Sequence, residues 1–365
     1  MSAARRIIDK PLLFLTALLV FVGVFVFSSA SLGLLARGSA VTSMALNHLL
    51  LGLGGGTLAL FILSRLNYRL LKTLAPYAFG FSLILTALVF VPGIGYSAGG
   101  AARWIAFAGF SMQPSELLKL TSVMMMAYLL VEYRTRVQEY WGLALLGGVL
   151  VLPAALVLMQ PDTGTFGVIA CGTCAVYFAA GTRLRDIAIV AAVGIALLTV
   201  LIFTRPYVME RVRTFMNPAH DQRGSSYQVK QSLIAIGSGG FLGRGYGQSI
   251  QKFEYLPEPV NDSIFAVASE EFGFVGSTLI ILMFIAFAAR GFWLATKVPD
   301  AFGSLLIVGI ITYISIQAFI NIASMLSLMP LTGIPLVFMS QGGTALLVAL
   351  SAVGVVLSVS RSATR

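Results

Sequence analysis

Long runs of apolar residues recur along this 365-residue chain, and no other feature restricts its fold so strongly. An α-helix of about 20 apolar residues is long enough to cross the hydrocarbon core of a bilayer. On this criterion the sequence predicts ten spans, at residues 11–31, 46–64, 74–94, 115–133, 141–159, 164–181, 186–204, 264–289, 301–326 and 335–359. The first run follows a basic segment, but it is long enough to be a retained span rather than a signal peptide. The expected fold is an all-α, polytopic membrane protein with a single domain over residues 1–365.

The composition excludes an ordinary soluble domain. Hydrophobic residues make up 58% of the chain and charged residues only 10%, whereas about 25% of the residues in soluble domains are charged. The net charge of +10 does not indicate a nucleic-acid partner, because the basic residues lie in small groups between the apolar runs. His48 and His220 are isolated in the sequence, so no histidine metal site is predicted.

The basic residues also indicate how the spans are oriented. With both chain ends in the cytoplasm, most Lys and Arg residues fall in cytoplasmic segments, whereas the short outer loops contain Arg37 and Arg103. This distribution predicts an N-in, C-in protein with one large extracytoplasmic loop, residues 205–263, between the seventh and eighth spans. Two segments of that loop, RPYVMERVRTFMNP and SSYQVKQSLIAIGSGG, are expected to be amphipathic and to lie along the outer membrane surface.

Polar motifs gather where the predicted outer loops meet the spans. Glu116 and Lys119 are three residues apart, so they can meet on one helix face, either as a salt bridge inside the bundle or as groups that hold substrate. The segment that contains Gly243, Gly245 and Gly247 has neither the preceding strand nor the GKS or GKT sequence of a nucleotide-binding loop. We interpret these glycines as flexible backbone beside a substrate groove.

Asp262 differs from the other acidic residues because it directly precedes a predicted span. An aspartate at this position can cap the helix, or it can act at the water-accessible entrance of the span. On a regular helix, Glu270 would lie about 80° around the axis and about 12 Å deeper than Asp262, and Glu271 would point about 100° further away. The two glutamates are therefore not expected to face one site, and one of them is expected to tie helices together.

Together these motifs resemble the SEDS family (shape, elongation, division and sporulation), which includes FtsW, RodA and SpoVE. The resemblance rests on ARWIAFAGFSMQPSELLKL, QPDTGT, RVRTFMNP, GSSYQVKQSLIAIGSGGFLGRGYGQS, QKFEYLPEP, IFAVASEEFGFVG and PLTGIPLVFMSQGG, in that order. It implies a peptidoglycan glycosyltransferase of the bacterial cytoplasmic (inner) membrane that polymerises lipid II at the outer face. The segments GQSIQKFEYLPEP and LTGIP are closer to the FtsW division branch than to the RodA elongation branch. The resemblance also implies that Asp262 is the catalytic aspartate.

Three family signatures are altered in this chain. The usual His-Thr-Asp-Phe is Val-Asn-Asp-Ser at 260–263, the usual Glu-Pro-Asp is Gln-Pro-Asp at 160–162, and the usual Ser-Tyr-Gly-Gly is Ser-Gln-Gly-Gly at 340–343. The loss of the histidine argues against a mechanism that needs an imidazole beside the aspartate, but Asp262 itself is retained.

The hypothesis for Asp262 is general-base catalysis. The carboxylate would take the proton of an acceptor GlcNAc 4-hydroxyl as C1 of the donor MurNAc loses undecaprenyl pyrophosphate. The leaving pyrophosphate needs cations, for which the candidates are Arg103, Lys119, Arg213, Arg223, Lys230, Arg244 and Lys252. The other candidates for substrate binding are Gln113, Ser115, Glu116, Asp162, Gln228, Gln231 and Glu258. A divalent cation, Mg²⁺ or Mn²⁺, is a further candidate at the pyrophosphate, and the sequence does not establish it.

The resemblance also implies partners. It predicts a class B penicillin-binding transpeptidase and other membrane proteins of the divisome or elongasome. Two other functions stay open. A lipid II flippase or transporter would use the ionisable residues in the spans as a path, although the polar motifs crowd at one face and no half-repeat is evident. A non-catalytic scaffold for the transpeptidase is the third reading.

Overall fold

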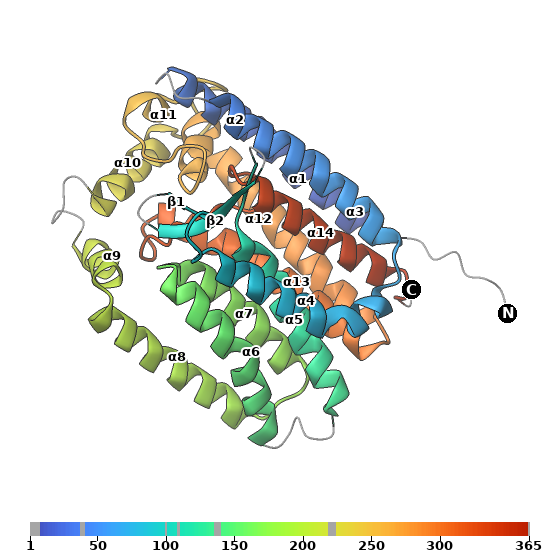
Figure 1. The fold of residues 1–365 in the computed structure, drawn as a ribbon. Helices are drawn as coiled ribbons and strands as arrows, with labels where there is room; N and C mark the ends of the chain where they lie inside the picture. The colour runs from blue at the N-terminus through green and yellow to red at the C-terminus, as the bar shows by residue number, and fades with distance from the viewer. Residues whose placement is uncertain are drawn as a thin grey trace.

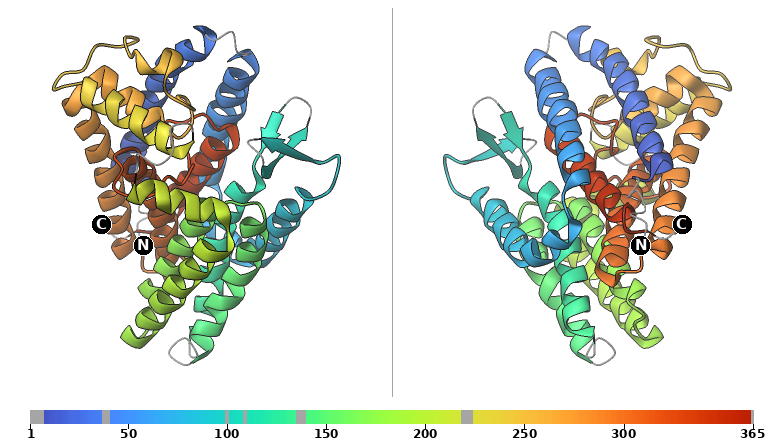
Figure 2. Two further views of the ribbon diagram at one scale, coloured as in Figure 1. Left: turned by 90° about the vertical axis from the view of Figure 1, so that its left-hand side faces the viewer. Right: turned by 90° about the vertical axis from the view of Figure 1, so that its right-hand side faces the viewer.

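The computed structural model describes residues 8–36, 41–98, 101–107, 110–134, 140–217 and 224–363. Helices dominate these ranges, and a small sheet joins them on one side (Figures 1 and 2). In chain order the elements are α1 (Lys10–Ala36), α2 (Val41–Leu46), the π-helix η1 (Asn47–Gly55), α3 (Gly56–Arg65), α4 (Tyr68–Leu88), β1 (Gly95–Ala98), β2 (Ala101–Phe107), β3 (Phe110–Met112), α5 (Pro114–Glu132), α6 (Tyr140–Met159), α7 (Thr163–Ala179), α8 (Leu184–Thr204), α9 (Pro206–Met216), α10 (Ser225–Ser238), α11 (Gln251–Glu254), α12 (Ile264–Lys297), α13 (Ala301–Met325) and α14 (Gly343–Ser360).

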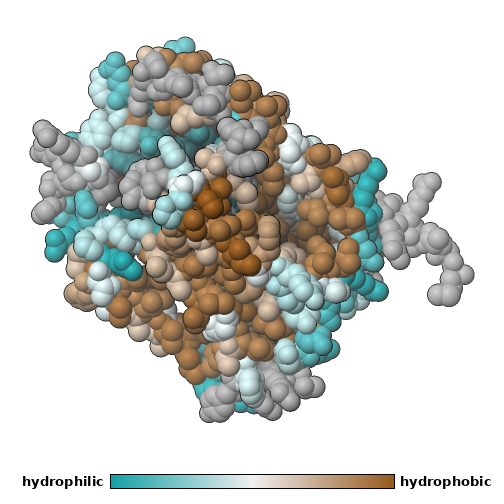
Figure 3. Space-filling view, viewed as in Figure 1, coloured by the Kyte–Doolittle hydropathy of each residue, from teal (hydrophilic) through white to brown (hydrophobic). Residues whose placement is uncertain are grey.

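The apolar runs form the long helices, as the sequence predicts. Nine helical segments in the described ranges are long and apolar enough to cross a membrane; one of them, Met44–Arg65, combines part of α2 with η1 and α3. Helix α7 is also apolar but has only 17 residues, so the total of ten spans stays a prediction. Phe14, Phe21 and Phe203 are more than half exposed, and brown apolar residues cover the middle of the face in Figure 3. These features establish a helical, multi-pass membrane protein.

Helices α5, α13 and α14 form the centre of the bundle and are buried along most of their length. The outer helices bury only one side. In α1 the buried residues include Leu12, Thr16, Leu19 and Val26, which follow the spacing of one helix face. Helix α8 is the most peripheral, because only Asp186 and Leu201 of its residues are buried (Figure 1).

The two ends of the chain meet on one side of the bundle. The backbone N–H of Asp9 donates to Ser360 Oγ at 3.1 Å, and Arg290, near the end of α12, forms an ion pair with Asp9 at 2.6 Å. Asp262 precedes the other end of α12, where α10 and α11 also lie (Figure 1). The two termini therefore share one face, as an N-in, C-in topology requires, and Asp262 lies at the opposite face.

The structure adds a sheet that the sequence did not predict and moves several helix boundaries. Strands β1, β2 and β3 form an antiparallel sheet in that order, directly after the span expected at 74–94, which is observed as Tyr68–Leu88. The span expected at 335–359 begins only at Gly343. The preceding residues form a turn in which the N–H of Leu336 donates to Ser340 Oγ at 2.8 Å, so they do not join the helix.

Helix α12 is broken near its start. Gly273 has a φ of +64° and a ψ of −161°, which separates a half-helix that begins next to Asp262 from a longer helix that continues to Lys297. The loop after α10 enters the break and bonds the backbone groups on both sides of it. These bonds run from Arg244 N to Glu270 O (3.0 Å), from Gly245 N to Glu271 O (2.9 Å), from Phe274 N to Gly240 O (2.9 Å) and from Val275 N to Phe241 O (3.2 Å).

Of the three glycines in this loop, Gly243 permits close packing rather than movement beside a groove. Gly243 has a φ of +83°, and a Cβ atom added to it would lie 2.1 Å from the carbonyl oxygen of Glu271. The interpretation of Gly243 as flexible groove lining was therefore wrong. Its missing side chain lets the loop enter the break in α12.

Candidate active site

Asp262 lies in a turn that two other elements hold in place. The side-chain amide of Asn321, in α13, donates to the carbonyl oxygens of Asp262 and Ile334, both at 2.8 Å. The turn before α14 binds the two preceding residues: Ser340 Oγ donates to Asn261 O, and Gln341 N donates to Val260 O at 2.7 Å. The predicted outer motifs PLTGIP and SQGG thus meet at Asp262, although they are distant from it in sequence.

The carboxylate of Asp262 is poorly solvated. Its Oδ1 is buried and accepts no hydrogen bond from any side chain or backbone group in the described ranges. Burial raises the pKa of Asp262 to about 6, and the nearby charge of Glu258 acts in the same direction. Gln228 and Arg211 act in the opposite direction and favour the charged form. A carboxylate of this kind is ionised near neutral pH and can accept a proton.

Two of the predicted substrate-binding residues flank Asp262. Gln228, in α10, donates to Ser263 Oγ at 3.0 Å, and Glu258 accepts a 2.6 Å hydrogen bond from the amide of Asn261. Glu258 is exposed. On the same helix as Gln228, Lys230 is exposed and Gln231 is half-buried. Helix α10 therefore places Gln228 beside Asp262, whereas Lys230 and Gln231 lie on the same helix without a contact to Asp262 among the described hydrogen bonds.

Arg103, Gln113 and Asp162 are brought together at the start of α7. The Nε of Arg103 donates to the carbonyl oxygen of Gln160 at 3.0 Å, its Nη2 donates to the carbonyl of Pro161, and its Nε lies 4.0 Å from Asp162 Oδ2. Asp162 caps α7 by accepting from the backbone N–H of Thr165 at 3.0 Å. Gln113 Nε2 lies 3.4 Å from Asp162 Oδ2.

Arg211 belongs to this region and was missed in the sequence. Its Nη1 donates to the carbonyl oxygen of Thr332 at 3.0 Å, and its charge lowers the pKa of Asp262. The predicted Arg213 lies elsewhere, in a cavity of about 620 Å³ that also includes Phe203 and Glu210. Residues two apart on a helix differ in direction by about 200°. The available signal in the sequence was the four-residue spacing of Tyr207 and Arg211, which places both side chains on one face of the helix. In the structure the Arg211 guanidinium lies 5.8 Å from the centroid of the Tyr207 ring.

The predicted pair Glu116 and Lys119 is built into the bundle. Lys119 is 1% exposed, its Nζ lies 2.8 Å from the Glu116 carboxylate, and it donates to Gln317 Oε1 at 2.5 Å. Gln317 in turn donates to the carbonyl of Pro335 at 3.1 Å. Ser115 is also buried, and its hydroxyl has no hydrogen-bond partner within the described ranges. The Lys119 ammonium thus supports the turn that holds Arg211 rather than opening onto a surface.

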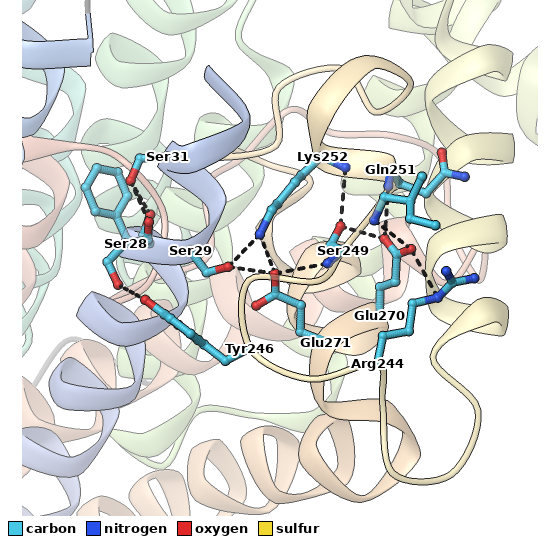
Figure 4. A network of polar contacts seen from close by, with 12 residues as sticks. Ser28, Ser29, Ser31, Arg244, Tyr246, Ser249, Gln251, Lys252, Glu270 and Glu271 are labelled. Carbon is cyan, nitrogen blue, oxygen red and sulfur yellow. Dashed lines mark hydrogen bonds and ion pairs between the residues drawn. The ribbon is translucent and has the colours of Figure 1, made fainter. Parts of the chain in front are cut away.

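Lys252 lies in a second buried network. Its Nζ donates to Glu271 Oε1 at 2.6 Å and to Ser29 Oγ, in α1, at 2.8 Å (Figure 4). Arg244 lies 3.5 Å from the carboxylate of Glu270, next to the same network (Figure 4). Neither cation is brought to Asp262, and the remaining candidate, Arg223, lies outside the described residues.

Both glutamates of α12 contact one segment, contrary to the expectation from a regular helix. Ser249 Oγ donates to Glu270 at 2.6 Å, and Ser249 N lies 3.4 Å from Glu271 Oε1 (Figure 4). Glu270 also accepts from the backbone N–H groups of Ile250 and Gln251. The expectation was wrong because the loop folds back across the half-helix, so one segment reaches both carboxylates.

The described residues contain no group of three or more His, Cys, Asp or Glu side chains that could hold a metal ion. Asp262 and Glu258 supply two neighbouring carboxylates. Mg²⁺ is commonly held by one or two carboxylates together with substrate phosphates. The donor set is therefore too small for a metal site made by protein alone, but it suits a cation that arrives with a phosphorylated substrate.

The chain matches known proteins over nearly its whole length. Residues 10–365 match the family model for cell cycle proteins of the FtsW, RodA and SpoVE type. The chain is 38% identical to stage V sporulation protein E of Bacillus subtilis over 99% of both chains. It is 36% identical to the probable peptidoglycan glycosyltransferase FtsW of Trichlorobacter lovleyi, over 96% of this chain and 93% of the relative.

Two solved structures share the fold over nearly the whole chain. One was determined in work on the structural coordination of polymerization and crosslinking by a peptidoglycan synthase complex; it has a TM-score of 0.81 and 29% identity, and covers 97% of this chain and 98% of its own. The other is the crystal structure of the rod shape determining protein RodA of Thermus thermophilus, with a TM-score of 0.72, 28% identity and 98% of both chains covered.

Proposed function

Because the chain belongs to the FtsW, RodA and SpoVE family of cell cycle proteins and is a peptidoglycan glycosyltransferase, we propose that Asp262 is its general base. The observation that carries this proposal is the buried, unpaired Oδ1 of Asp262 in the described part of the chain, together with a pKa raised to about 6. A base with a pKa near the working pH combines a large ionised fraction with useful basicity.

The substrate in this proposal is lipid II. Asp262 takes the proton of the acceptor GlcNAc 4-hydroxyl as its oxygen bonds to C1 of the donor MurNAc. The bond from C1 to the pyrophosphate breaks at the same time, and undecaprenyl pyrophosphate leaves with the bonding electrons. Displacement from the opposite side inverts C1, so an α-linked donor gives a β-linked glycan.

Protein cations near Asp262 would stabilise the charge that develops on the leaving group. Arg103 and Arg211 are the arginines whose positions support this role. If Mg²⁺ or Mn²⁺ accompanies the substrate, Glu258 is the exposed carboxylate beside Asp262 that would hold it, and the cation would supply further charge neutralisation.

The cellular setting is proposed from the relatives. Asp262 lies at the face opposite the two termini, which supports an outward-facing site in the bacterial cytoplasmic membrane with both ends inside. The similarity to a chain from a peptidoglycan synthase complex supports a class B penicillin-binding transpeptidase as partner. Relatives named FtsW favour a role in cell division, with the same chemistry in elongation as the alternative.

The test is polymerisation of labelled lipid II by the purified full-length protein, with and without its transpeptidase. Wild-type protein should produce glycan ladders and Asp262→Asn should not. Asp300→Asn is the matched control, because Asp300 caps α13 by accepting from Gly303 N at 2.9 Å, at the face of the bundle that carries the termini. Wild-type ladders from Asp262→Asn would refute the general-base role. Transfer of lipid II across liposomes without any ladder would favour a flippase instead.

A further inference from the structure

A cavity of about 620 Å³ lies between the last turn of α8 and the helix α9 that follows it. Its wall includes Arg213, which has no part in the site at Asp262. Residues two apart on a helix differ in direction by about 200°. The cavity therefore lies on the side of α9 opposite to Arg211, whose guanidinium bonds the carbonyl of Thr332, and it is separate from the site at Asp262.

One part of the cavity wall is apolar and belongs to the lipid-facing side of the bundle. Ile202 and Phe203 come from α8, a helix long and apolar enough to span a membrane, and the Phe203 side chain is 76% exposed. Pro206 and Met209, from the first turn of α9, complete this part of the wall. Because α8 ends at Thr204, the cavity lies where the apolar span meets the amphipathic helix. In a membrane, lipid headgroups and the first carbons of their acyl chains occupy this level.

The other part of the wall carries two opposite charges. Glu210 and Arg213 are three residues apart on α9, so both lie on the face of the helix that lines the cavity. Both are exposed, and neither takes part in an ion pair within the described ranges. Thr214, beside them, is buried and accepts a hydrogen bond from Ser226 of α10 at 3.4 Å. The carboxylate and the guanidinium are therefore available to a ligand that carries charges of both signs.

The two charges suit a phosphoethanolamine headgroup. Its phosphate can accept two parallel N–H bonds from the planar guanidinium of Arg213. Its ammonium is joined to the phosphate by two carbon atoms and can donate to the carboxylate of Glu210. A choline headgroup has the same charges but no N–H donor, and a glycerol headgroup has no cation. The charge pattern therefore favours an amine-bearing phospholipid over the other two.

We propose that the cavity between α8 and α9 binds a glycerophospholipid with a phosphoethanolamine headgroup. The phosphate lies on Arg213, the ammonium lies on Glu210, and an acyl chain follows the exposed Phe203 ring into the bilayer. Helix α8 buries little of its surface against the rest of the bundle, so a lipid that fills this cavity would join α8 to α9. The lipid takes no part in the reaction at Asp262.

The first test compares phospholipids with identical acyl chains, by native mass spectrometry of the purified full-length protein in detergent. Phosphatidylethanolamine should bind about 3- to 10-fold more tightly than phosphatidylcholine, because only its ammonium can donate to Glu210. It should also raise the Tm more, since a ligand stabilises the folded state that binds it. Phosphatidylglycerol should bind more weakly because it has no cation for Glu210. Equal binding of the three lipids, or tighter binding of phosphatidylglycerol, would overturn the proposal.

The second test assigns the two charges. Glu210→Gln keeps the size of the side chain and removes its charge, so it should abolish the preference for phosphatidylethanolamine over phosphatidylcholine. Arg213→Ala should weaken the binding of both lipids by about 3- to 10-fold, since both carry the phosphate. Glu254→Gln and Arg205→Ala are the matched controls, because these exposed residues lie outside the cavity wall; both variants should bind lipids as the wild type does. A preference for phosphatidylethanolamine that survives Glu210→Gln would refute the assignment.

A third measurement separates this lipid from the substrate of the reaction. Undecaprenyl pyrophosphate should leave bound phosphatidylethanolamine in place, because the cavity and Arg211 lie on opposite sides of α9. Asp262→Asn should bind phosphatidylethanolamine as tightly as the wild type does. Displacement of phosphatidylethanolamine by undecaprenyl pyrophosphate would show that the cavity belongs to the lipid substrate, and it would overturn the proposal.

Discussion

Asn321 binds the backbone of Asp262 directly: its side-chain amide donates to the Asp262 carbonyl oxygen at 2.8 Å. The same amide donates to Ile334 O at 2.8 Å, so one buried side chain joins α13, the turn before α12 and the turn that holds Arg211. A carboxylate can act as a base only if it stays within reach of the proton it accepts. Asn321 is therefore a positioning residue for Asp262.

Asn321→Ala should lower turnover by about tenfold or more and unfolding free energy by about 1–3 kcal/mol, because two buried carbonyl groups lose their donor. Glycan synthesis and Tm measure the two effects. Ser315→Ala on the same helix is the control, since the Ser315 hydroxyl has no hydrogen-bond partner in the described residues. Equal behaviour of the two variants would remove Asn321 from the positioning role.

The activity should depend on pH through Asp262. A general base works in its ionised form, and burial raises the pKa of Asp262 to about 6. The rate should therefore fall as pH decreases through about 6 and level off above about 7. Initial rates of lipid II polymerisation between pH 5 and pH 8 would measure this fall in rate. A rate that stays constant down to pH 5 would contradict the assignment of Asp262 as the base.

The same pKa predicts that Asp262 destabilises the fold at neutral pH. Its folded-state pKa lies above the ordinary value of 3.8, so the folded state holds the proton more tightly than the unfolded state. The stabilising contribution is present below pH 3.8 and is lost as pH rises through about 6. Asp262→Asn should therefore have a higher Tm than wild type at pH 7.5 and a smaller advantage at pH 5. A lower Tm at pH 7.5 would show that the carboxylate stabilises the fold.

The helical bundle follows from local sequence, whereas much of the site depends on contacts between distant segments. Apolar runs predict the long helices, and the amphipathic pattern of the loop predicts α9 and α10. Asp262 was identified from its place before a span and from the family motif. The number of spans, by contrast, depends on how α7 is counted, because it has 17 residues.

The residues whose surroundings differ from the expectation are those whose environment comes from elsewhere in the chain. Lys252 was expected to bind substrate, but it is fully buried against Ser29, which is 223 residues away. Arg213 was preferred to Arg211, although only the tertiary fold decides which side of α9 faces the turn at Thr332. The role of Gly243 depends on a break in a helix that begins 21 residues later. Local spacing does not contain such information.

The buried pair of Lys252 and Glu271 should behave as a coupled unit. Both side chains are 0% exposed and their charged atoms lie 2.6 Å apart. Lys252→Met should lower the unfolding free energy by about 3–5 kcal/mol, because it leaves a buried carboxylate without its cation. Adding Glu271→Gln should restore a large part of that stability. Denaturation of the two single variants and the double variant measures the coupling, and strictly additive losses would contradict it.

Gly243 and Gly247 have similar φ angles but different surroundings. Gly243 has a φ of +83° and Gly247 a φ of +79°, but a Cβ atom added to Gly243 would lie 2.1 Å from Glu271 O, whereas none of the described atoms lies within 4 Å of one added to Gly247. Gly247→Ala should therefore cost only the backbone strain, about 1–3 kcal/mol. Gly243→Ala should cost more than about 4 kcal/mol, because it also expels the loop from the break in α12. The Tm and the folded yield of the two variants in detergent measure this difference. Equal losses of stability in the two variants would mean that the inserted loop does not stabilise the fold.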